Sequence, residues 1–164
     1  VCLRSQMIAK IRGGWSACLR AFLRILMLSA DGLATGGVPL HIGGTHTMLY
    51  ARVANLLSDG DGLRAALDWK GASSMKPCFR HYNIFKKDSD LAHRKPGFEE
   101  ITCSDPSKFK TWTAKDVWFA VDVLKGAHTR FASGNMRMYQ VENLGQMYGL
   151  HYNGYGVLAD VVLR

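Results

Sequence analysis

The pattern of apolar and polar positions predicts helices toward both ends of the chain. Residues 6–28 carry apolar side chains at the spacing of one helix face, namely Leu19, Phe22, Leu23 and Leu26. This pattern predicts a helix over residues 6–28. The pair Gly13-Gly14 weakens its interior, so a division into two helices is the alternative.

Three further helices are predicted, over residues 62–69, 114–125 and 136–148. The helix at 114–125 has the clearest signals. Thr113 and Asp116 have the spacing of a capping box, and Gly126 is predicted to end the helix. Its apolar stripe consists of Val117, Trp118, Val121 and Leu124. Gly149 is predicted to end the last helix.

The middle of the chain indicates short strands among loops. Residues 48–57 are apolar enough for a buried strand or a short helix, and periodicity alone leaves both open. We favour a strand that leads to Asp59. The glycine pairs in residues 34–46 predict turns at strand ends. Residues 70–110 are rich in loops around one predicted strand, 98–103, and a bound metal would offset the cost of ordering so long a stretch.

Composition and charge narrow the function. The 164 residues suit one domain with a real core, and 48% hydrophobic against 21% charged residues is ordinary globular composition. The net charge is +8, and residues 1–30 hold five basic and no acidic side chains. A basic segment of this kind attracts polyanions such as DNA or RNA. A solvated helix face is an equally weighted alternative.

Within residues 1–30, Arg20 and Arg24 lie one helical turn apart and are candidate phosphate contacts. The apolar run at 17–28 is shorter than the roughly 20 residues of a membrane span, so no membrane partner is expected. An organelle presequence is an alternative explanation of this segment. The chain begins with Val1 and ends on an apolar run, which indicates a fragment.

An acidic pair follows the predicted strand. Asp59 and Asp61 are placed as carboxylates at a strand end, where a divalent metal for phosphoryl transfer is commonly held. Helix capping by either residue explains the same spacing and is favoured when the pair is considered alone. An EF-hand is excluded, because Leu63 and Lys70 stand where the loop needs oxygen ligands.

A second candidate site is the short Cys-x-x-His formed by Cys78 and His81 behind Pro77. This is the spacing of a zinc knuckle, and the remaining two ligands would come from His93 and Cys103 or from outside the chain. A buried thiol beside a surface histidine is the alternative. The four cysteines are widely spaced and are expected to be reduced, in an intracellular protein.

Cations and aromatic rings alternate over residues 76–95, a mixture suited to nucleic acid, with cations on phosphates and rings on bases or sugars. The candidate contacts are Lys76, Arg80, Lys86 and Lys87. An exposed loop with a few core aromatics has the same composition.

An ordered set of motifs resembles the central block of DDE transposases of the KDZ and Plavaka type. The set consists of Asp59, then Lys70-Gly71, then Pro77-Cys78-x-x-His81. That family has cysteine where this chain has His81, a replacement that zinc tolerates. Supporting stretches are residues 35–40, 99–109 and 149–164.

The resemblance implies a partial RNase H-like core in which three acids hold Mg²⁺ for DNA strand transfer, with Asp59 as the second acid and Asp61 as a weaker candidate. It implies DNA as partner, Zn²⁺ at the knuckle and a nuclear location. The first acid is not evident and the third would lie beyond Arg164, so the segment alone is not expected to catalyse strand transfer.

The sequence therefore predicts a mixed α/β protein. Residues 1–30 form a basic amphipathic helical segment, and residues 31–164 form a partial transposase-like domain with an insertion at about 70–110. Two alternatives remain open, a non-enzymatic basic module that binds nucleic acid and an organelle-targeted structural subunit.

Overall fold

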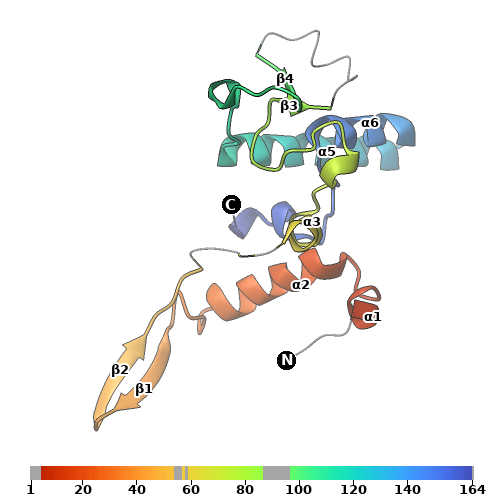
Figure 1. Ribbon diagram of the computed structural model, residues 1–164. Helices are drawn as coiled ribbons and strands as arrows, with labels where there is room; N and C mark the ends of the chain where they lie inside the picture. The colour runs from red at the N-terminus through yellow and green to blue at the C-terminus, as the bar shows by residue number, and fades with distance from the viewer. Residues whose placement is uncertain (1–4, 54–56, 58, 87–96, 164) are drawn as a thin grey trace.

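The structure, a computed structural model, describes residues 5–53, 57, 59–86 and 97–163. It is 47% helical and 12% strand, which confirms the mixed α/β class. Within the described residues the named strands form two separate two-stranded sheets, one antiparallel and one parallel. The helices build most of the body, and one hairpin projects from it (Figure 1).

The N-terminal region consists of two helices, the alternative that the sequence left open. They are α1 (Ser5–Ile8) and α2 (Gly14–Phe22), and a π-helical turn, η1 (Leu23–Met27), continues α2. Gly13 and Gly14 both have positive φ, a conformation that favours glycine, and they separate the helices. Two residues of the apolar stripe, Phe22 and Leu26, are exposed. The helix is buried instead at Ser16, where it meets the C-terminal segment through a hydrogen bond from the Val157 amide.

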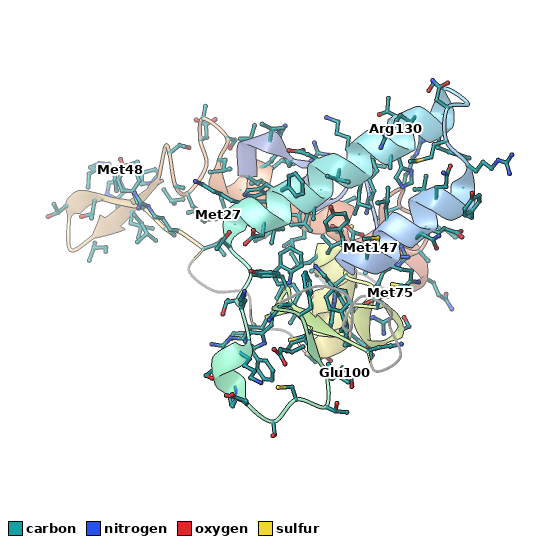
Figure 2. All side chains as sticks on the ribbon, turned by 90° about the horizontal axis from the view of Figure 1, so that it is seen from above. Met27, Met48, Met75, Glu100, Arg130 and Met147 are labelled. Atoms are coloured by element: carbon teal, nitrogen blue, oxygen red, sulfur yellow. The ribbon has the colours of Figure 1, made fainter. Side chains whose placement is uncertain are left out.

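The projecting hairpin pairs β1 (Val38–Ile42) with β2 (Thr45–Leu49). Gly43 and Gly44, both with positive φ, form its two-residue turn, as expected for a hairpin whose turn matches the strand twist. The predicted turn is confirmed. Of the strand predicted over 48–57, residues 48–49 belong to β2 and residues 50–53 are not in a strand, while 54–56 lie outside the described residues. Met48 lies on this arm, away from the helical body (Figure 2).

The centre of the molecule contains α3 (Gly60–Leu67) and the short helix η4 (Val157–Ala159), and both contact α2. Ala66 is the buried residue of α3. A second short helix, η5 (Val161–Leu163), follows η4 along the chain. Residues from distant parts of the chain thus meet beside α2 (Figure 1).

On the other side of α3 lie α5 (Ala114–Ala132) and α6 (Met138–Tyr148), packed against each other (Figure 1). The Thr113-Asp116 capping box of α5 is confirmed, and Gly149, with φ of 70°, ends α6 as predicted. The prediction that Gly126 ends α5 is wrong. A glycine inside a helix costs only about 0.5–1 kcal/mol, and burial of Ala127 beyond it favours continuing the helix.

The loop-rich region lies against the α5–α6 pair and contains little regular structure. Its elements are η2 (Gly71–Ser73), β3 (Ile84–Phe85), β4 (Glu99–Glu100) and η3 (Pro106–Lys108). β3 and β4 are parallel, and the predicted strand at 98–103 shrinks to β4. Met75 and Glu100 mark this region in Figure 2.

Candidate functional site

Cys78 and His81 lie side by side on the surface of the loop-rich region. The distance from Cys78 Sγ to His81 Nδ1 is 3.3 Å, and both side chains are half-buried. In a tetrahedral zinc site with Zn–S of about 2.3 Å and Zn–N of about 2.0–2.1 Å, two such ligand atoms are about 3.5 Å apart. The pair therefore fits two corners of a zinc site in both donor chemistry and spacing.

Backbone pairing with the segment before α5 holds this corner in place. His81 and Thr111 form an antiparallel bridge. On either side of it, the Trp112 amide donates to the Arg80 carbonyl at 3.1 Å and the Tyr82 amide donates to the Lys110 carbonyl at 3.0 Å. The His81 ring also packs on Phe109, with 5.4 Å between ring centroids. The position of the histidine is thus fixed by contacts that need no metal.

Asn83 organises the loops around the corner, and the sequence analysis did not identify it. Its side chain is fully buried, and its Nδ2 donates to the Gly97 and Lys108 carbonyls, each at 2.9 Å. Its Oδ1 accepts from the Lys110 amide at 2.8 Å. The side-chain amide of Asn83 thereby links its own loop to Gly97 and to residues 108–110. These hydrogen bonds stabilise the loop-rich region, a role that was predicted for a bound metal. An asparagine two residues past a Cys-x-x-His was the available sequence signal.

Lys76 points into the molecule and not toward solvent. It is 8% exposed, and its Nζ lies over four aromatic rings at centroid distances of 4.6–5.9 Å, those of Trp112, Phe85, Tyr148 and Tyr82. Such cation–π contacts stabilise a desolvated ammonium group. Lys76 was predicted to contact phosphate. It instead holds its loop against Trp112, which precedes α5, and against Tyr148 at the end of α6.

Cys103, the one other predicted zinc ligand within the described part of the chain, does not join the pair. Cys103 lies after β4, and its thiol approaches the carbonyl of Asp105 at 3.9 Å. His93 lies outside the described residues. Among residues 5–53, 57, 59–86 and 97–163, no group of three or more His, Cys, Asp or Glu side chains is placed to hold a metal.

Asp59 is the N-cap of α3, and its Oδ1 accepts a hydrogen bond from the Gly62 amide at 2.7 Å. Asp61, in the first turn, forms an exposed ion pair with Arg64 at 3.1 Å. The last named strand before them, β2, ends at Leu49, and residues 54–56 and 58 lie outside the described residues, so the expected strand-end position of Asp59 stays a prediction. Asp59 has the capping role that spacing alone had favoured, and Asp61 is paired with Arg64.

Arg20 and Arg24 both bind Asp160, whose side chain is 1% exposed. Arg20 Nε donates to Oδ2 at 2.6 Å, and a guanidinium nitrogen of Arg24 donates to Oδ1 at 2.8 Å. Burial by itself raises the pKa of Asp160, but hydrogen bonds from the two arginines and from the Val162 amide hold it below its usual value. These two cations, predicted to meet phosphate, instead join α2 to the C-terminal segment.

The remaining predicted nucleic-acid contacts are Arg80, Lys86 and Lys87. Arg80 is exposed beside Cys78, and Lys86 is half-buried at the end of β3. Lys87 lies outside the described residues. The positive charge near the Cys78–His81 corner is thus carried, in the described part, by fewer exposed cations than the sequence suggested.

No protein-family model matches this chain, and comparison with curated proteins and with solved structures finds no similar protein. Among the described residues, no helix combines the length and the apolar character needed to cross a membrane.

Proposed function

We propose that this chain is a segment of a DNA-acting protein of the KDZ and Plavaka transposase type, in which Cys78 and His81 supply two ligands of a structural zinc ion. The observation that carries the proposal is the 3.3 Å separation of the thiol sulfur and the imidazole nitrogen. Zinc would add rigidity to a surface corner that is already held by pairing with residues 110–112.

The order of motifs supports the same assignment. Asp59 begins a helix, α3, and that helix leads through Lys70 to Gly71, whose φ of 72° favours glycine. Cys78 and His81 follow within the same compact region. In the proposal this region is the central part of an RNase H-like protein with DNA as its partner and the nucleus as its location.

The proposal assigns strand transfer to the intact parent protein and not to this segment. Carboxylate and water oxygens are the ligands that Mg²⁺ prefers, and the described residues contain no group of three or more candidate side chains around Asp59. Asp59 would contribute one oxygen ligand to a site completed by acids from other parts of the parent. Mg²⁺ would supply charge stabilisation during phosphoryl transfer.

Cobalt titration tests the zinc ligands, because Co²⁺ occupies zinc sites and reports thiolate binding by its absorption. We expect the metal-free chain to bind one Co²⁺ and to release it to Zn²⁺. Cys78→Ser and His81→Asn should each weaken binding at least about tenfold, the magnitude typical of disturbing a metal site. The matched control is Cys18→Ser, since Cys18 is also half-buried but lies on α2.

If Cys78→Ser bound Co²⁺ with the affinity of the wild type, Cys78 would not be a metal ligand and the proposed zinc site would be contradicted. Cys103→Ser then distinguishes the source of the further ligands. Loss of affinity in this variant would require the segment after β4 to move toward Cys78, and unchanged affinity would assign the remaining ligands elsewhere.

DNA binding is tested separately by fluorescence anisotropy with duplex DNA at a series of salt concentrations. We expect affinity to fall steeply with salt, and Lys86→Gln to reduce the slope of log K against log salt by about one, since one phosphate contact is lost. Lys125→Gln, the same change at an exposed position of α5 that is not among the predicted contacts, is the control. Asp59→Ala should leave affinity unchanged, and binding that is insensitive to salt would contradict DNA as the partner.

A further inference from the structure

A pocket of about 520 Å³ opens beside the Cys78–His81 corner, between the end of α3, the start of α5 and the end of α6. Three of the four tryptophans of the chain line it, Trp69, Trp112 and Trp118. Phe79 and Tyr148 add two more aromatic rings. Its volume is in the range of sites that take small organic ligands, which is roughly 300–1,000 Å³.

The walls of the pocket are almost entirely apolar, and this limits the ligand. Among the described residues that line it, Arg80 is the one charged side chain, and no carboxylate is present. A nucleobase has several hydrogen-bonding groups, and the lining offers few polar side chains to them, among which are Thr111, Thr113 and Arg80. Each group left without a partner would cost about 1–3 kcal/mol. A hydrocarbon or simple aromatic body has no such groups and gains free energy from burial.

Arg80 adds one positively charged group to the lining of the pocket, and a purely hydrophobic ligand would form no ion pair with it. Its side chain is exposed, while its backbone carbonyl is held by the Trp112 amide at 3.1 Å. A guanidinium group binds a carboxylate through paired N–H donors. The chain as a whole carries a net charge of +8, which also favours an anion.

We propose that this pocket binds a lipophilic monocarboxylate, with its apolar body between the tryptophans and its carboxylate at Arg80. This binding activity is additional to the proposed zinc and DNA functions and does not depend on them. Long-chain fatty acids and aromatic carboxylates share the required chemistry.

Energy transfer from tryptophan to cis-parinaric acid tests the proposal with a probe that has the required chemistry. Trp15→Phe removes the one tryptophan that does not line the pocket, so that all remaining tryptophan emission comes from its walls. We expect saturable transfer at one site with a dissociation constant at or below about 100 µM, as ligand efficiency allows for a molecule of this size. Arg80→Gln should weaken binding about fivefold, the effect of one exposed ion pair.

Two controls separate recognition of the carboxylate from general hydrophobic adsorption. Arg52→Gln makes the same charge change at an exposed position away from the pocket and should leave affinity unchanged. The methyl ester of the probe should bind the wild type and Arg80→Gln equally. Transfer that does not saturate, or that Arg80→Gln does not weaken, would overturn the proposal.

Cys78 provides a second measurement, because it lines the pocket. In the metal-free Cys2→Ser, Cys18→Ser, Cys103→Ser background, bound oleate should slow modification of Cys78 by N-phenylmaleimide at least about threefold, in line with fractional occupancy of the site. An unchanged rate at saturating oleate would place the ligand elsewhere and overturn the proposal. Equal protection by a 5′-mononucleotide would also overturn the proposal, in favour of a nucleotide site. Where oleate protects and the mononucleotide does not, comparing decanoate with naphthoate distinguishes aliphatic from aromatic ligands.

Discussion

Replacing Arg20 and Arg24 together by methionine is expected to lower the free energy of unfolding by about 3–5 kcal/mol, the cost of leaving a buried charge without its partners. Asp160 is 1% exposed, so in the variant its carboxylate has lost water and both guanidinium groups. The aliphatic parts of the arginines are preserved by methionine, which limits the effect to the charge. Urea unfolding followed by circular dichroism measures it.

The reverse change should be less costly. In Asp160→Asn the two arginines keep access to solvent, since their side chains are 28% and 45% exposed. Exposed cations that lose a partner can be rehydrated, and we expect a loss of about 1–2 kcal/mol. Arg52→Met is the control for adding a methionine at an exposed site. Equal losses in Asp160→Asn and the double variant would show that the desolvated carboxylate is not the origin of the effect.

The same ion pairs predict a dependence of stability on pH. Because the pKa of Asp160 is held below that of an unfolded aspartate, about 3.9, its contribution is present above this value and is lost as pH falls through the folded pKa. The stability difference between the wild type and the double arginine variant should therefore be large at neutral pH and shrink as the pH falls below the ordinary aspartate pKa of about 3.9. A difference that stays constant over this range would contradict the assignment.

Asn83→Ala is expected to destabilise the protein by about 3 kcal/mol, because a fully buried side chain loses three hydrogen bonds at roughly 1 kcal/mol each. The affected groups are the Gly97 and Lys108 carbonyls and the Lys110 amide. Since Lys110 adjoins the segment that pairs with His81, we also expect weaker Co²⁺ binding.

The control for this change is Asn143→Ala, an exposed position on α6 where alanine suits the helix. It should change the free energy of unfolding by less than about 0.5 kcal/mol. Hydrogen exchange at the Lys110 amide gives a local measurement, because this amide donates to Asn83 in the wild type. A general loss of packing would speed exchange at many amides and not at this one in particular. Protection of that amide in Asn83→Ala equal to the wild type would contradict the role given to Asn83.

Local signals predicted the helices well. Asp59 and the Thr113-Asp116 pair mark the starts of α3 and α5, and Gly149 marks the end of α6. These signals succeed because each cap is satisfied within one turn of the chain. Gly126 failed as an end signal because the burial of Ala127, a contact with distant residues, outweighs a small local cost.

The spacing of Cys78 and His81 predicted that the two side chains lie together, but it did not predict what surrounds them. A Cys-x-x-His spacing is short enough for the backbone to bring Cys78 and His81 together, and it did so at 3.3 Å. The charges were less predictable. Arg20, Arg24 and Lys76 were expected at a phosphate surface, but their partners include Asp160, Trp112 and Tyr148, which are far away in sequence.

Residue types and spacing alone thus establish the mixed α/β character, the helix caps, the glycine turn and the pairing of Cys78 with His81, since each depends on neighbours within a few residues. Chain folding is needed to place Asn83 among three loops, to bury Asp160 between two arginines, and to gather three tryptophans around one pocket. The reason is that desolvation and long-range packing, which set the energies of these contacts, depend on residues that the linear pattern does not bring together.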